Sequence, residues 1–142
     1  MKKIIFISFA ASFFCLIGFG QKIKDAELPA AVKTSFQNKY PGISAKWEKE
    51  EGNYEANFKK EGNQMSATFQ ADGTFLESEV SIKESALPAA AQSYIQANYK
   101  GKSVKETAKI TSATGTITYE AEIEGRDLIF GSDGKFLKVE KN

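Results

Sequence analysis

The sequence lacks histidine entirely and contains one cysteine, Cys15, among its 142 residues. Without histidine, no imidazole is available to act as a general base, to complete a catalytic triad or to ligate a metal. Cys15 lies in an N-terminal apolar run, so the rest of the chain has no thiol for catalysis, zinc binding or a disulfide. A glycine-rich phosphate-binding loop is also missing. The sequence therefore predicts no catalytic residue, no metal site and no cofactor, and we expect that the protein is not an enzyme.

An excess of charge of either sign is missing as well, since 19 basic residues stand against 18 acidic ones. Loss of the two N-terminal lysines would leave 17 basic residues and a net charge of about −1. Nucleic-acid binding requires a basic stripe, and electrostatic membrane binding requires a polybasic segment. We therefore expect no nucleic-acid partner, and no membrane contact once the N-terminal segment has been removed.

One long apolar run is present, at residues 4–19, and two lysines precede it. A short basic segment, an apolar run and small residues at its end are typical of a secretory signal peptide. We predict a signal peptide over residues 1–20 and a mature protein that is periplasmic or secreted. A retained membrane anchor is the alternative, but the run is shorter than the ~20 residues that a spanning helix needs. Cys15 lacks the small preceding residues of a lipid-modified cysteine and is interpreted as part of the apolar run.

The rest of the chain contains two copies of one pattern. Leu-Pro-Ala-Ala at residues 28–31 recurs 59 positions later, at residues 87–90. Two further blocks also recur, residues 54–58 as 119–123 and residues 69–76 as 130–137. The link at residues 83–85 is too short for a flexible linker, so the two copies are expected to touch. We predict a first repeat over residues 21–83 and a second over residues 84–142.

Each copy begins with a helix pattern and continues with strand patterns. Apolar residues recur at every fourth position along residues 25–40 and again from Leu87 to Tyr99. After each helix, apolar and polar residues alternate over four runs that turn residues separate. The predicted fold class is α+β, with two tandem repeats, each one helix packed on a four-stranded antiparallel β-meander. One sheet face packs under the helix, and the other, polar face is expected to lie in water.

Three aromatic residues are candidate binding residues. If residues 72–73 form a two-residue hairpin turn, Phe75 lies opposite Gln70 on the polar face, and Phe136 takes the same place in the second repeat. Exposed rings beside polar strands are plausible anchors for a partner. The alternative is a three-residue turn with a bulge, which would shift the register and return both rings to the core. Trp47 alternates in phase with core residues and is interpreted as core, with an interface anchor as the alternative.

Carboxylates are the remaining chemically capable groups. Glu120, Glu122 and Glu124 alternate along one predicted strand, and Glu55 lies on the polar face of the first repeat. Such a row can supply an acid and a base or a calcium-binding patch. A ladder of glutamates on a solvated strand face is far commoner, and this is the interpretation that the sequence favours.

The combined pattern resembles the PepSY-like family. The residues that carry the resemblance are the two Leu-Pro helix starts, Tyr-Pro-Gly at residues 40–42 and Tyr-Lys-Gly at 99–101, and the Asp-Gly turns followed by Phe-Leu. The resemblance covers residues 26–140. The family is typical of exported proteins of Bacteroidetes-type bacteria and is described as similar to the beta-lactamase inhibitor protein. The resemblance implies two helix-plus-sheet units whose sheets form one curved surface, which in that inhibitor grips an enzyme.

Two functions are consistent with these features. The first is an exported, non-catalytic binding module for a protein partner, as an inhibitor of an envelope or secreted enzyme. The second is an envelope protein that binds a small ligand or calcium through the acidic sheet face.

Overall fold

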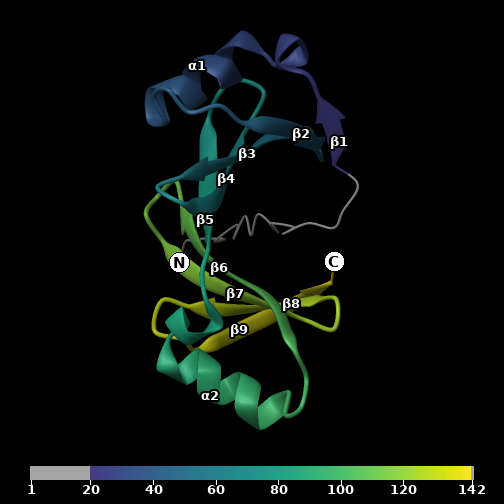
Figure 1. The fold of residues 1–142 in the computed structure, drawn as a ribbon, viewed down its shortest axis with the longest axis vertical. Helices are drawn as coiled ribbons and strands as arrows, with labels where there is room; N and C mark the ends of the chain where they lie inside the picture. Colours follow the sequence, from purple (N-terminus) through teal and green to yellow (C-terminus); the bar gives the residue numbers. More distant parts are fainter. Residues whose placement is uncertain (1–19, 142) are drawn as a thin grey trace, which may run out of the picture.

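The protein is described by a computed structural model of residues 20–141, so the predicted signal peptide lies outside the described residues except for Gly20. These residues form an α+β fold with two α-helices and one nine-stranded antiparallel sheet. Figure 1 shows the helices at opposite ends of the molecule with the sheet between them. Within the described part, no helix is long and apolar enough to cross a membrane. The elements are β1 (Gln21–Ile23), α1 (Ala30–Lys39), β2 (Lys46–Glu50), β3 (Asn53–Lys60), β4 (Asn63–Phe69), β5 (Phe75–Ser81), α2 (Ala89–Asn98), β6 (Val104–Ser112), β7 (Ile117–Ile123), β8 (Arg126–Gly131) and β9 (Phe136–Lys141).

The strands lie in the sheet in the order of the sequence, from β1 to β9. Four strands, β2 to β5, follow α1, and four more, β6 to β9, follow α2. Strand β5 pairs with β6, so the two predicted meanders are parts of one continuous sheet. The short strand β1, which the sequence analysis did not predict, extends the sheet by pairing with β2. The sheet bends between the helices, and its face away from them lies on the inside of the bend (Figure 1).

The first helix is shorter than the predicted segment 25–40. Residues Asp25–Glu27 form a separate 3₁₀ turn, Leu28 is extended with ψ 137°, and α1 begins at Ala30. Pro29 explains the break, because the residue before a proline is kept out of the helical region. The second helix follows the same plan after its own Leu-Pro pair.

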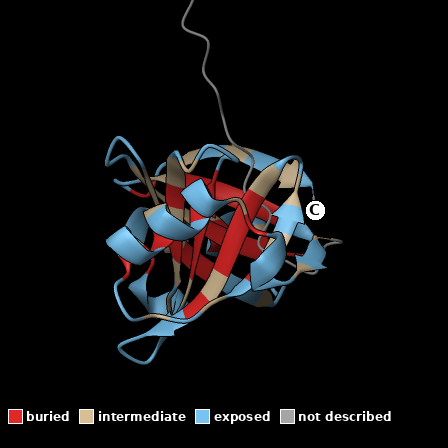
Figure 2. Cartoon of the chain, turned by 90° about the horizontal axis from the view of Figure 1, so that it is seen from above, coloured by how far each residue is buried: buried red, intermediate tan, exposed pale blue. Residues whose placement is uncertain are grey.

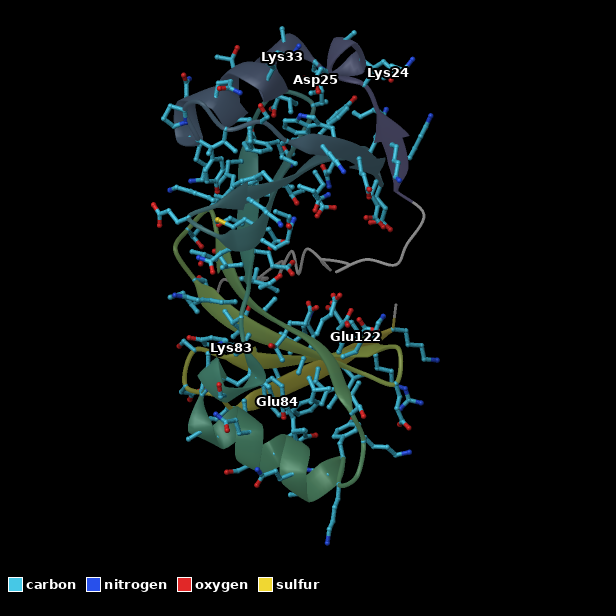
Figure 3. All side chains as sticks on the ribbon, in the orientation of Figure 1. Lys24, Asp25, Lys33, Lys83, Glu84 and Glu122 are labelled. Carbon is cyan, nitrogen blue, oxygen red and sulfur yellow. The ribbon has the colours of Figure 1, made fainter. Side chains whose placement is uncertain are left out.

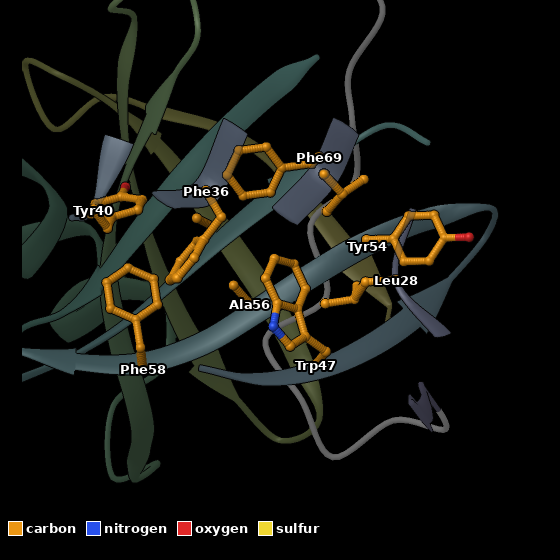
Figure 4. Close-up of a cluster of buried hydrophobic side chains, with 10 residues drawn as sticks. Leu28, Phe36, Tyr40, Trp47, Tyr54, Ala56, Phe58 and Phe69 are labelled. Carbon is orange, nitrogen blue, oxygen red and sulfur yellow. The ribbon is translucent and has the colours of Figure 1, made fainter. Parts of the chain in front are cut away.

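The core of the first half is built from aromatic rings between α1 and the sheet (Figure 4). The Phe36 ring centroid lies 5.2 Å from that of Trp47 and 5.3 Å from that of Phe58, both edge to face. Trp47 is 5% exposed, as its favoured interpretation as a core residue requires. Figure 2 shows the buried segments of the strands behind the exposed outer side of α1. The second core lies under α2 in the same way, around Ile95 and Phe130.

The prediction that Phe75 lies on the polar face was wrong. The alternative, a three-residue turn with a bulge, is confirmed: the Gln70 amide donates to the Thr74 carbonyl at 2.9 Å, and a register shift pairs Phe69 with Phe75. Gly73 takes the left-handed conformation that closes such a turn, with φ 86°. The extra residue returns the Phe75 ring to the helix side, where its centroid lies 5.6 Å from that of Phe69.

Phe136 is displaced from the polar face for the same reason. Its strand shows the equivalent register shift, which pairs Phe130 with Phe136. The Phe136 ring stacks on Tyr94 of α2, with the centroids 4.5 Å apart and the planes 4° from parallel. Both rings therefore pack between sheet and helix.

The glycines of these two hairpin turns, Gly73 and Gly134, lie against the starts of the helices. A Cβ atom on Gly73 would lie 2.6 Å from the Ala31 carbonyl oxygen at the start of α1. A Cβ atom on Gly134 would lie 2.7 Å from Pro88 Cβ at the start of α2. Only glycine allows this approach of hairpin turn to helix start in combination with a positive φ.

Candidate binding site on the inner face of the sheet

Six buried acidic side chains lie on the sheet face that points away from the helices. Residues directly opposite each other on neighbouring strands share a face, and Glu55 on β3 lies opposite Thr68 on β4, which in turn lies opposite Glu77 on β5. Figure 3 shows Glu122 on the side of β7 that faces away from α2. We call this set the inner acidic face: Glu55, Glu77, Glu79, Glu120, Glu122 and Asp127.

These carboxylates are buried, so the expectation of a solvated glutamate ladder was wrong for Glu120 and Glu122. None of the six residues is more than 8% exposed, and Glu120 is 2% exposed. The third member of the predicted row, Glu124, does not belong to the face. It lies in the turn after β7 with φ 56°, and its carboxylate pairs with Lys102 at 2.6 Å.

Burial makes several of these carboxylates hard to ionise. Desolvation, followed by the neighbouring charge of Glu79, raises the pKa of Glu120 to about 9. The same two causes raise the pKa of Glu77 to about 7. Burial also raises the pKa of Glu55 to about 8, where the Ser66 hydroxyl opposes the rise and Glu79 adds to it. The negative charge of Glu79 thus raises the pKa of carboxyl groups in both halves of the sheet.

Several polar atoms of the face have no hydrogen-bond partner among residues 20–141. They include Glu120 Oε2, Glu77 Oε1 and Thr68 Oγ1. Glu122 is half satisfied, because its Oε1 accepts a hydrogen bond from Lys105 Nζ at 2.9 Å while its Oε2 has no partner among these residues. Leaving a buried polar group unsatisfied costs about 1–3 kcal/mol, and more when it is charged. The inner acidic face therefore favours a ligand that would supply donors to these oxygens.

The arrangement does not form a metal site among the described residues. No three Asp, Glu, His or Cys side chains of residues 20–141 gather closely enough to hold an ion. A pocket of about 40 Å³ opens on the face beside Glu55, Ser66 and Glu79, which admits little more than a side-chain tip. The face is thus a spread-out row of acceptors.

The sequence analysis found part of this site. It placed Glu55, Glu120 and Glu122 on the polar face but missed Glu77, Glu79 and Asp127. The signal in the sequence was the second alternating pair, Glu77 and Glu79, which the predicted register already places opposite Thr68 and Ser66 on the polar face. Phe75, Phe136 and Trp47 lie on the other side of the sheet, and their role in binding stays a prediction.

A family model described as beta-lactamase-inhibitor-like, PepSY-like matches residues 19–77 and 52–138. The chain belongs to this family. Comparison with curated proteins gives no match. The PepSY-like fold is shared with several solved structures from Bacteroides.

A DUF2874 family protein from Bacteroides uniformis is 17% identical, with a TM-score of 0.71 over 79% of this chain and 88% of that one. A BLIP-like protein from Bacteroides fragilis is 21% identical, with a TM-score of 0.64 over 78% of this chain and 83% of that one. A protein from Bacteroides eggerthii that is described as periplasmic is 17% identical, with a TM-score of 0.70 over 80% of this chain and 88% of that one. At these identities the likeness establishes the fold, and the described location of the last protein agrees with the predicted export.

Proposed function

We propose that this PepSY-like protein is an exported, non-catalytic binding module that holds a protein partner on its inner acidic face. The observation that carries the proposal is Glu120, which is 2% exposed and has a carboxylate oxygen without a hydrogen-bond partner among the described residues. A folded chain tolerates such a group when a function requires it. Donors from a partner would satisfy it.

The extent of the face supports a macromolecular partner over a small ligand or a calcium ion. Its carboxylates occur on strands from β3 to β8. With neighbouring strands ~4.8 Å apart, five spacings correspond to roughly 24 Å along the sheet. An extended segment of a protein matches that span, whereas one ion needs several ligands at one point.

We further propose that the partner is an envelope or secreted enzyme and that this protein inhibits it. The family's description as beta-lactamase-inhibitor-like supports it. We also propose that the chain is a tandem repeat with its boundary between residues 83 and 84. The two family-model segments support a repeated unit.

The experiment compares three purified baits in cross-linking pull-downs from the cell envelope, read by mass spectrometry. The baits are the wild type, the double variant Glu77→Gln/Glu120→Gln on the inner acidic face, and the control Glu61→Gln/Glu124→Gln. The control makes the same number of glutamate-to-glutamine changes in exposed turns outside the face. Captured enzymes are then assayed with increasing amounts of each bait.

We expect a protein that the wild type and the control recover and that the inner-face variant loses, while circular dichroism shows all three baits folded. Inhibition of a captured enzyme by the wild type and control alone would identify the protein as an inhibitor. Equal recovery by all three baits would show that the inner acidic face is not the binding surface.

A further inference from the structure

We infer that β9 pairs edge to edge with β9 of a second copy of this chain, antiparallel, with the two Val139 residues directly opposite each other. The sheet that residues 20–141 form ends at β1 on one side and at β9 on the other, and in it β9 pairs with β8 alone. The outer backbone groups of such an edge strand are a template for a further strand. The inference goes beyond the proposed function and does not depend on it.

The first half of the chain shows the equivalent edge covered. Phe75 begins β5 and Phe136 begins β9, and each follows a hairpin with the same register shift. On its other side β5 pairs with β6, and the Leu76 carbonyl accepts a hydrogen bond from the Ala113 amide at 2.7 Å. The fold thus covers this edge in its first half and leaves it open in its second, as far as residues 20–141 show.

The apolar side chains of β9 also indicate that a strand is added there. Leu137 is 55% exposed and Val139 40%, and they are the large apolar side chains that stay exposed within residues 20–141. Val139 lies opposite the fully buried Leu128 of β8, so it continues the apolar face of the second core to the edge of the sheet. The other edge, β1, has three residues and follows the usual protection of an edge by a very short strand.

The charges of β9 select a second copy and fix its register. Two antiparallel strands related by a two-fold axis place one residue opposite its own copy, and residues on the same face oppose each other. An axis at Lys138 or Lys141 would place two lysines opposite each other, and an axis at Glu140 two glutamates. An axis at Val139 instead places Lys138 of each copy opposite Glu140 of the other. Opposite charges at facing positions are favourable and like charges are not, so the axis passes at Val139.

The same pairing extends an ion pair that the chain already forms. Lys138 contacts Glu140 within β9. Bringing two strands together about Val139 joins two such ion pairs into one row of alternating charge. The two apolar Val139 side chains then cover each other on the opposite face of the sheet.

Charge exchange on the mature chain, residues 21–142, tests the register by sedimentation velocity over a range of concentrations. Lys138→Glu and Glu140→Lys each place like charges opposite each other in a pair of identical copies. We expect wild type and the control Lys100→Glu, at an exposed turn residue, to form dimers. Each single β9 variant should dissociate with a constant at least tenfold higher. An equimolar mixture of the two should associate like wild type, because opposite charges face each other again in the mixed dimer.

A single introduced thiol tests the contact independently. The sequence has no cysteine after Cys15. Facing residues of an antiparallel pair have Cα atoms about 4.5–5.5 Å apart, a separation that a disulfide spans. In the inferred dimer Val139→Cys therefore brings two thiols together, whereas the two thiols of the control Leu137→Cys lie more than about 13 Å apart. We expect mild oxidation of the dilute protein to cross-link Val139→Cys at least tenfold faster than Leu137→Cys.

Three outcomes would overturn the inference. One is a wild type that stays monomeric at every concentration. Another is a mixture of the Lys138→Glu and Glu140→Lys variants that associates no better than either alone, while circular dichroism shows both folded. The third is a Val139→Cys product, in envelope extract, that joins β9 to another protein in place of a second copy.

Discussion

Replacing Glu120 by glutamine should make the protein more stable in alkaline solution and leave it almost unchanged in acid. The pKa of Glu120 is about 9 in the folded protein against 4.5 for an ordinary glutamate. Between these values the folded state binds a proton that the unfolded state releases. Stability therefore falls as the pH rises from about 4.5 to about 9. Glutamine has the shape of the protonated acid and does not titrate, so it removes this part of the pH dependence.

The size of the effect follows from the two pKa values. One unit of pKa shift is worth roughly 1.4 kcal/mol. At pH 8 the wild type lies more than three units above the unfolded value, which sets an upper limit of about 5 kcal/mol. Glu55 and Glu77 on the same face also titrate in this range. Because their ionisation is coupled to that of the face as a whole, we expect a smaller net gain of about 2–3 kcal/mol at pH 8. That corresponds to an increase in melting temperature of roughly 10 °C for a chain of this size.

The assay is thermal unfolding of wild type, Glu120→Gln and Glu124→Gln, followed by circular dichroism from pH 4.5 to pH 9. Glu124 is the matched control because it lies in an exposed turn and pairs with Lys102. We expect the gap between Glu120→Gln and wild type to widen steadily with pH, and the gap for Glu124→Gln to stay within about 2 °C. A constant or shrinking gap for Glu120→Gln would refute the assignment of a buried, protonated carboxyl group at this position.

Two further predictions concern the fold. Gly73→Ala should destabilise the protein by about 2–4 kcal/mol in urea unfolding, because positive φ strain adds to a collision with the first turn of α1. Gly52→Ala is its control, with a similar φ and open space around it, and an equal loss for both would contradict the proposed contact. Phe75→Ala should cost about 1–3 kcal/mol through lost packing, whereas Leu137→Ala, which truncates a 55% exposed side chain, should cost less than about 0.5 kcal/mol. Equal stability of Phe75→Ala and Leu137→Ala would contradict the packing of the Phe75 ring between sheet and helix.

Local pattern was enough to predict most elements. The Leu-Pro pairs and the spacing of apolar residues at every fourth position indicated both helices. The preference of proline for a helix start and the apolar stripe depend only on residues close together in the sequence. Trp47 was correctly interpreted as core from its phase with the preceding apolar residues. The error at Phe75 came from a turn that is one residue longer than assumed. The bulge that follows Phe75 compensates for the extra residue, so that Glu77 lies opposite Thr68 as the shorter turn also requires and only Phe75 changes face.

The sequence by itself determined which residues alternate, where helices begin, and that carboxylates at Glu55, Glu120 and Glu122 lie opposite the apolar face. Only the tertiary structure decided that these carboxylates are buried. These carboxylates become buried only when β3 to β8 join in one bent sheet (Figure 1). That sheet depends on the pairing of β5 with β6, which α2 separates in the sequence. A glutamate on a single strand is solvated by default. It loses its water, and with it the ordinary pKa, only when strands from both halves surround it.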